Sequence, residues 1–231
     1  MKNIIEVINI EKEYPLKNQR VKVLNGISFD IKNGEFVAIM GPSGSGKSTL
    51  LHILSGLDKP TLGKSLVLGK QINNLNDEEI SSFRRTKLGF IFQSYNLIEN
   101  LNVEENILFP LLLNGKKKKD MMIKLNCILK DVGLYDRRYH KPRELSGGQQ
   151  QRTAIARALI IEPEILFADE PIGNLDSKTG DDIIEMLNEI NNKYNMSIVM
   201  VTHDLNSARH CNRIIHILDG KIDQIEIRES N

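Results

Sequence analysis

The sequence of 231 residues predicts a fold of the α/β class that a helical segment interrupts. Short apolar runs recur along the chain, as is typical of strands buried on both faces of a sheet. They occupy residues 36–40, 89–92, 165–168 and 197–201. Amphipathic segments of helical period separate the later runs, and between about residue 95 and residue 160 the pattern is helical alone. Together these observations indicate one α/β core with a helical insertion.

The first elements can be assigned in chain order. Residues 4–10 and 27–31 alternate apolar with polar side chains, as half-exposed strands do. The pair Asn33-Gly34, which is typical of hairpin turns, stands directly before the strand at 36–40. A helix starts after the glycine-rich residues that follow, with the apolar residues Leu50, Leu51, Ile53 and Leu54. Residues 77–87 begin with acids and end with bases, an order that favours a helix because it complements the helix dipole.

Two amphipathic helices and a hairpin are predicted further along. The first helix ends at Gly133, a residue favoured just after a helix, and the second precedes the strand at 197–201. Their apolar residues are Met121, Leu125, Ile128, Leu129 and Val132 in the first, and Ile183, Ile184, Leu187, Ile190 and Tyr194 in the second. Residues 214–218 and 222–227 flank Asp219-Gly220, which predicts a terminal β-hairpin.

Composition and charge limit the classes of function that this chain can have. The formal net charge is +1, so no overall positive field marks a nucleic-acid binder, and no nucleic-acid partner is expected. Cys127 and Cys211 lack metal-ligand spacing and are expected to be reduced thiols of a cytosolic protein. The charged N-terminal residues form no signal-peptide core. The apolar run at 107–113 is short and contains Pro110, so we expect this chain not to cross a membrane.

Residues 41–49 fit the pattern G-x-x-x-x-G-K-[ST] at every fixed position. A backbone that wraps closely around phosphate oxygens requires glycine. Lys47 would place its charge at the β- and γ-phosphates, and Ser48 would bind Mg²⁺. A buried strand precedes the loop and a helix follows it, as nucleotide binding requires. The predicted nucleotide site consists of Gly41, Pro42, Ser43, Gly44, Ser45, Gly46, Lys47, Ser48 and Thr49.

Polar residues follow the other buried strands. Asp169 ends the strand at 165–168 and would hold Mg²⁺, directly or through water, while the adjacent Glu170 would polarise a water that attacks the γ-phosphate. Gln93 and His203 follow two further strands. Ligands bind at the strand ends of open parallel sheets, so both could reach the phosphates, although a lone Gln or His there is more often structural.

A second anion-binding pattern lies at Leu145-Ser146-Gly147-Gly148-Gln149, about a hundred residues after the phosphate loop. Ser146 is a good N-cap for the helix predicted at residues 150–159, and the two glycines expose backbone N–H groups. The residues alone leave open whether the two phosphate-binding elements serve one nucleotide or two chains.

In their order along the chain, these motifs resemble those of the ATP-binding cassette (ABC) ATPases. The matching motifs are the Walker A loop (41–49), the Q-loop (Gln93), the signature (145–149), the Walker B motif (165–169) with Glu170 as the catalytic glutamate, the D-loop (173–176) and the switch histidine (His203). The resemblance covers nearly the whole chain.

The resemblance implies a P-loop NTPase fold with a RecA-like core, an N-terminal antiparallel β subdomain and an inserted α-helical subdomain. It implies a single domain over residues 1–231. In that domain, residues 1–94 and 160–231 would form the ATP-binding core, and residues from about 95 to 159 would form the helical subdomain that carries the signature.

The resemblance further implies an ATPase that uses ATP and Mg²⁺. Tyr14 would stack on adenine. The implied catalytic residues are Lys47, Glu170 and His203, the metal ligands are Ser48, Gln93 and Asp169, and the nucleotide contacts outside the phosphate loop are Tyr14, Gln93, Ser146, Gly147, Gly148, Gln149 and Asp176. The signature would act on ATP held by the opposite subunit, so that two ATP molecules are sandwiched in a head-to-tail homodimer.

The exact residues of three motifs narrow the resemblance to one group of ABC ATPases. Residues 89–93, 145–152 and 173–177 are similar to the ATPases of macrolide exporters, lipoprotein-release systems and antimicrobial-peptide transport or resistance systems. Ile172 and residues 62–64, which replace a threonine and a Ser-Gly-containing turn, depart from that group. This similarity implies a separate integral membrane permease as partner, a cytoplasmic position on the inner face of the membrane, and the export or removal of a peptide, drug or lipoprotein.

Two other functions stay open. One is a scaffold-type ATPase of a cell-envelope or cell-division complex. The other is an ATPase that acts on nucleic acid or ribosomes, which is disfavoured because the chain has neither a long coiled-coil insertion nor a second cassette. The basic residues 116–119 are expected to be a solvated loop rather than a contact for anionic lipid or an acidic partner.

Overall fold

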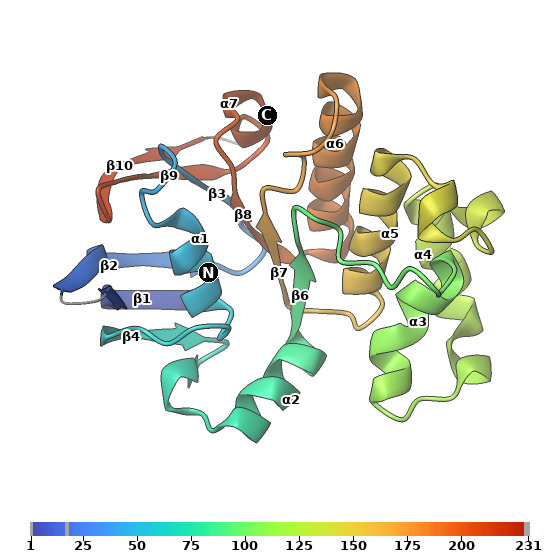
Figure 1. Ribbon diagram of the computed structural model, residues 1–231, viewed down its shortest axis with the longest axis horizontal. Coiled ribbons are helices and arrows are strands. Elements are labelled where there is room, and N and C mark those ends of the chain that lie inside the picture. The colour runs from blue at the N-terminus through green and yellow to red at the C-terminus, as the bar shows by residue number, and fades with distance from the viewer. Residues whose placement is uncertain (1, 17–18, 229–231) are drawn as a thin grey trace.

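The structure is a computed structural model that describes residues 2–16 and 19–228 (Figure 1). The strands are β1 (Asn3–Leu16), β2 (Gln19–Lys32), β3 (Phe36–Met40), β4 (Leu62–Val67), β5 (Lys70–Gln71), β6 (Leu88–Ile91), β7 (Ile165–Asp169), β8 (Ser197–Val201), β9 (Arg213–Leu218) and β10 (Lys221–Ile227). The α-helices are α1 (Lys47–Leu54), α2 (Asp77–Lys87), α3 (Val103–Leu113), α4 (Met122–Asp131), α5 (Gly147–Leu159), α6 (Ser177–Tyr194) and α7 (Leu205–Ala208). Short 3₁₀ helices lie at Ile72–Asn74, Lys118–Met121, Tyr135–Arg137 and Pro142–Glu144.

Within the described residues, the strands form two sheets. The larger has the order β10-β9-β3-β8-β7-β6, and its strands are parallel apart from β10, which pairs antiparallel with β9. The smaller, β2-β1-β4-β5, is antiparallel throughout. In Figure 1 the smaller sheet and α1 lie on the left, and α3, α4 and α5 lie on the right beyond β7 and β6.

Alternate side chains of β3 enter two hydrophobic clusters. Val37 and Ile39 pack with α1 and the smaller sheet, whereas Phe36, Ala38 and Met40 pack with the helices of the other face, which include α5 and α6. Successive side chains of a strand point to opposite faces of the sheet. The larger sheet is therefore covered on both sides at β3, which explains why this strand is apolar at every position.

The predicted buried strands are confirmed, although β6 both starts and ends one residue before the predicted segment. The terminal hairpin is also confirmed, since β9 and β10 pair across Asp219-Gly220. The hairpin at Asn33-Gly34 is wrong, because β2 and β3 belong to different sheets. Gly34 does turn the chain, at φ 77°. However, β3 is apolar on both faces and belongs inside the parallel sheet, while β2 alternates and has an exposed face.

Strand β4 was not predicted. Its first residues, Leu62-Gly63-Lys64, occupy the positions where the resembled group has a turn, yet here they pair with β1. Gly63 has φ 84°, and a Cβ there would lie 2.1 Å from the carbonyl oxygen of Asn9. Glycine thus permits the backbones of β1 and β4 to approach closely.

In the described part of the chain, no helix combines the length and the apolar character needed to cross a bilayer. Both cysteines are unpaired, with Cys127 exposed and Cys211 buried. Burial raises the pKa of the Cys211 thiol well above its ordinary value, so that thiol is un-ionised at neutral pH.

A buried ion cluster ties the start of α3 to the segment that precedes the signature. The Glu104 side chain is 4% exposed and accepts a hydrogen bond from Arg138 Nε at 2.9 Å. Lys118 Nζ lies 2.6 Å from the other carboxylate oxygen, Oε1. Burial alone would raise the pKa of Glu104, but the hydrogen bonds and charges of Lys118 and Arg138 hold it below its ordinary value.

Glu104→Gln is expected to lower the free energy of unfolding by about 3–5 kcal/mol, because it leaves the guanidinium of Arg138 without its buried partner. Lys118→Met should cost at most about 1 kcal/mol, because Lys118 is largely exposed. Since folding depresses the pKa of Glu104, its contribution is complete above about pH 5 and is lost as the pH falls further. Urea unfolding of both variants at pH 7 and pH 4 checks this, and equal losses at pH 7 would contradict it.

Candidate functional site

The phosphate loop, residues 41–49, joins β3 to α1 along a path that needs glycine. Gly41, Gly44 and Gly46 have left-handed backbones, at φ 153°, 81° and 100°. A Cβ on Gly41 would lie 2.1 Å from the carbonyl oxygen of Ile217, and one on Gly46 would lie 2.8 Å from that of Val23. Two neighbouring strands therefore fix the loop in place, and only glycine fits there.

Lys47 begins α1 with its side chain inside the loop. The residue is 7% exposed, and Nζ donates to the carbonyl oxygens of Gly41 at 2.9 Å and Pro42 at 3.0 Å. In the described residues, the nearby Ser45 Oγ is buried without a hydrogen-bond partner. A buried polar atom without a partner is costly. The Ser45 hydroxyl and the Lys47 ammonium are thus donors that phosphate oxygens in the loop could accept from.

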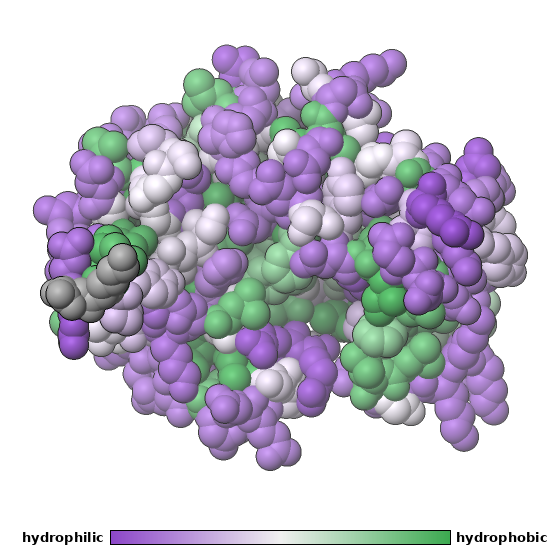
Figure 2. Space-filling model, viewed as in Figure 1, coloured by the Kyte–Doolittle hydropathy of each residue, from purple (hydrophilic) through white to green (hydrophobic). Residues whose placement is uncertain are grey.

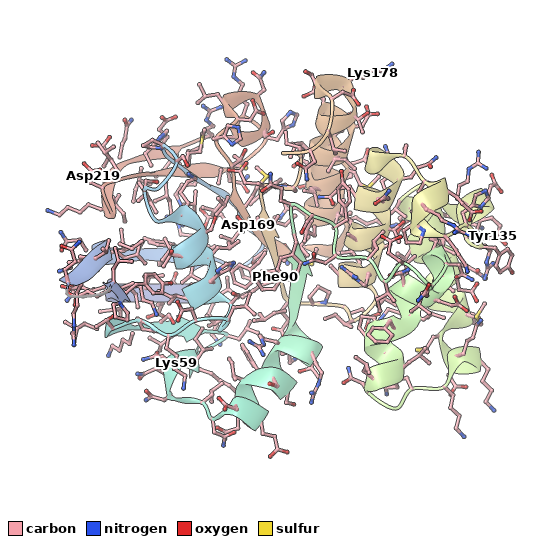
Figure 3. All side chains as sticks on the ribbon, viewed as in Figure 1. Lys59, Phe90, Tyr135, Asp169, Lys178 and Asp219 are labelled. Atoms are coloured by element: carbon pink, nitrogen blue, oxygen red, sulfur yellow. The ribbon has the colours of Figure 1, made fainter. Side chains whose placement is uncertain are left out.

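Asp169 ends β7 near the centre of the molecule and contacts α1 (Figure 3). Ser48 Oγ donates to Asp169 Oδ1 at 3.0 Å. Hydroxyl and carboxylate oxygens are suitable ligands for Mg²⁺. The ion usually binds one or two such protein groups, and water and substrate phosphates fill its other coordination positions. Among the described residues no group of three or more His, Cys, Asp or Glu side chains could hold a metal. The Ser48 hydroxyl and the Asp169 carboxylate thus have the chemistry of magnesium ligands, and their binding of the ion stays a prediction.

His52 is a further neighbour of Ser48 and Asp169, and no motif in the sequence points to it. Its Nε2 lies 3.8 Å from Asp169 Oδ2. His52 stands four residues after Ser48, and residues four apart share one face of a helix. The four-residue spacing from Ser48 is the feature of the sequence that could have identified His52.

Glu170 and His203 meet across two adjacent strand ends. His203 Nδ1 lies 2.9 Å from Glu170 Oε2 and 3.1 Å from Oε1. The backbone of Glu170 is left-handed, at φ 47°, and its N–H donates to Val201 O at 3.0 Å. Such strain persists only where the surroundings enforce it, and it clusters at functional sites. The carboxylate is 17% exposed and the imidazole 71%, so the pair opens to solvent beside Asp169.

Gln93 follows β6 and contacts the segment after β7. The backbone carbonyl oxygen of Gln93 accepts a hydrogen bond from Asn174 Nδ2 at 3.0 Å. Its amide lies over Gly173, where a Cβ would approach Gln93 Nε2 to 2.8 Å. The structure thus brings Gln93 to residues 173–176, and its role as a metal ligand stays a prediction. In that segment Asp176 is the N-cap of α6 and accepts from Thr179 N at 3.1 Å. Hydrogen bonds from the side chain and then the backbone of Thr179 lower the pKa of Asp176.

The signature residues form the first turn of α5. Ser146 is the N-cap, as predicted, and Gln149 N donates to its Oγ at 3.3 Å. A Cβ on Gly148 would lie 2.4 Å from Thr179 Cγ2, so glycine lets α5 approach α6. In Figure 1, α1 and α5 stand on opposite sides of the larger sheet's β7 and β6. The phosphate loop and the signature of one chain therefore do not face each other across one nucleotide.

Tyr14 lies near the end of β1 and is 39% exposed. Its hydroxyl donates to Asp58 Oδ2 at 2.6 Å, and Lys12 Nζ lies 4.7 Å from the ring centroid. Burial and the neighbouring Asp58 carboxylate raise the pKa of the phenol. The ring is thereby fixed in orientation but partly open, and its stacking on adenine stays a prediction.

A model of the family described as "ABC transporter" matches residues 24–173. The chain belongs to this family. It is 46% identical to the bacitracin export ATP-binding protein BceA of Halalkalibacterium halodurans, over 95% of this chain and 87% of that protein. It is 43% identical to the lipoprotein-releasing system ATP-binding protein LolD of Geobacter metallireducens, over 96% of this chain and 99% of that protein.

The fold agrees with solved ABC cassettes. The dimeric ATP-binding cassette MJ0796 of Methanocaldococcus jannaschii, in a post-hydrolysis state bound to ADP and Pi, superposes with a TM-score of 0.89. It is 42% identical in sequence, and the match covers 98% of this chain and 100% of that one. The chain is therefore an ATP-binding and ATP-hydrolysing subunit of the ABC type, with the P-loop NTPase fold.

Proposed function

We propose that this chain works as a homodimer around two ATP molecules and drives a separate membrane permease. The observation that carries the proposal is the separation of α1 from α5 within one chain (Figure 1). A second copy in head-to-tail orientation would bring its Ser146 and glycine amides to the phosphate loop of the first. The dimeric state of the MJ0796 cassette supports this arrangement.

In each composite site the side chains have distinct tasks. Lys47 would leave its loop carbonyls and bind the β- and γ-phosphates, while Glu170 and His203 orient the attacking water and accept its proton. Ser48 and Asp169 would hold Mg²⁺, which neutralises phosphate charge when bound. The partner's signature donors would bind the γ-phosphate, so ATP joins the two copies and hydrolysis releases them. We also propose that residues from about 95 to 159 form a helical subdomain that follows these changes.

A groove beside Gln93 is the proposed docking site of the permease. It has a volume of about 440 Å³ and lies between α2, β6 and the helices α3 and α5. Leu57, Phe90 and Ile161 supply apolar surface, and Arg84 and Arg85 supply positive charge. Figure 2 shows hydrophobic residues in the hollow between the two halves of the molecule. These features suit a short cytoplasmic helix of the permease with apolar and acidic side chains.

The names of the relatives support an export or removal function. One relative is named for bacitracin export and another for lipoprotein release. We therefore propose a peptide, drug or lipoprotein as the transported molecule, with this chain held at the inner face of the membrane by the permease.

The double variant Leu57→Asp/Arg85→Glu is expected to lose its membrane partner while ATP hydrolysis by the isolated chain stays unchanged. The substitutions put negative charge into the groove, and charge reversal at an interface weakens association by about tenfold or more. The measurement is affinity purification of the tagged chain from its native membranes, with Lys130→Glu on α4 as control. A multi-span membrane protein should accompany the wild type and the control only. Recovery of ribosomes or nucleic acid instead would contradict a transport function.

A further inference from the structure

Arg157 lies near the end of α5 and binds the segment that follows Gln93. Its Nη1 donates to the carbonyl oxygen of Asn96 at 2.6 Å, and Nη2 donates to that of Tyr95 at 2.9 Å. No carboxylate in the part of the chain that the structure describes pairs with this guanidinium. Because the guanidinium donors form a rigid fork, two bonds to consecutive carbonyls fix both the distance and the orientation of that segment.

The two accepting residues have an unusual backbone conformation. Tyr95 has φ 57° and Asn96 has φ 49°. The left-handed region is uncommon for a residue as bulky as tyrosine, and it persists only where the surroundings enforce it. Since the carbonyls bound by Arg157 belong to these residues, Arg157 is one of the contacts that enforce it.

Further contacts hold the same segment from other directions. A Cβ on Gly147 would lie 3.2 Å from Tyr95 Oη, so the tyrosine ring reaches the first turn of α5. Arg157 acts at the far end of that helix, and Asn174 binds the Gln93 carbonyl from the segment after β7. Residues 93–96 are thus held against the full length of α5 and against the catalytic strand end.

We propose that Arg157 is a positioning residue for ATP hydrolysis. It holds Tyr95 and Asn96 in their left-handed conformation, so that Gln93 and the signature at the start of α5 change position together. Arg157 also lines the groove proposed for the permease, so an occupant of that groove contacts this link directly. The proposed role of Arg157 rests on the proposed ATP hydrolysis by this chain. It does not depend on whether a permease occupies the groove.

The test compares Arg157→Met with Arg157→Lys in the full chain without a partner. Arg157→Met keeps the length of the side chain but removes both hydrogen bonds, and hydrogen exchange at residues 94–100 should become about tenfold faster. In the same variant kcat should fall about tenfold, with KM for ATP within about twofold of wild type, because nucleotide contacts are untouched. Arg157→Lys keeps one bond and should give intermediate values of both.

Arg152→Met is the matched exchange control, because Arg152 on the same helix donates to the Val132 carbonyl at 3.3 Å and does not contact residues 94–96. It should leave exchange at residues 94–100 unchanged. A uniform increase of exchange over the whole chain in Arg157→Met, or wild-type exchange and kcat, would overturn the proposal. If Arg157→Met does not fold, Arg157→Lys decides, since it must still show faster exchange confined to residues 94–100.

Discussion

Glu170→Gln is expected to lower the steady-state rate of ATP hydrolysis by about 100-fold or more while ATP still binds. The carboxylate lies beside His203 at the end of β7, where water can approach from solvent. The amide has the same shape but cannot accept a proton from the attacking water. Contacts of the phosphate loop with the nucleotide are unchanged, so affinity for ATP should stay within about twofold of wild type.

The matched control is Glu164→Gln, just before the opposite end of β7. Glu164 is about half exposed and pairs with Lys87 at 2.5 Å, far along the strand from the catalytic end. Its loss should leave the rate of hydrolysis unchanged. A wild-type rate in Glu170→Gln would remove Glu170 from its assigned role, whatever the control shows.

Ser146→Arg is expected to abolish hydrolysis and leave ATP binding by the single chain nearly intact. Loss of the N-cap costs about 1 kcal/mol, which is too little to unfold the domain. The long side chain would instead occupy the space where the signature meets the γ-phosphate of the other copy. Hydrolysis is measured by phosphate release, and binding by titration with a fluorescent ATP analogue.

Asn76→Arg separates helix capping from the shared site. Asn76 caps α2 with the same type of capping box that Ser146 forms on α5. The Asn76→Arg variant should therefore lose a similar free energy of unfolding to Ser146→Arg but hydrolyse ATP at the wild-type rate. If both arginine variants lose activity equally, capping rather than phosphate contact explains the effect of Ser146→Arg.

Much of the fold and site could be predicted from the sequence because the signals are local. The apolar residues 36–40 and the glycine pattern at 41–46 predict a buried strand and a phosphate loop without knowledge of neighbours. The cap at Ser146 is equally local. The ABC resemblance rests on short motifs in their order along the chain, and the family match over residues 24–173 confirms the family.

What could not be predicted depends on contacts between distant segments. Asn33-Gly34 predicts a turn, but the partners of the flanking strands depend on which faces are buried. Gly63 is informative only once Asn9 lies against it. Arg157 looks like any helical arginine until the fold brings to it the carbonyls of residues 95 and 96, which are 62 and 61 residues away in the sequence.

The most direct test of the shared ATP site is sedimentation velocity of Glu170→Gln and of the double variant Glu170→Gln/Ser146→Arg, each with and without ATP. Glu170→Gln cannot complete hydrolysis, so ATP should keep it dimeric, and removal of ATP should return it to the monomer. The double variant should stay monomeric in ATP although it binds the nucleotide. An ATP-dependent dimer of the double variant as stable as that of Glu170→Gln would contradict a site that two copies share.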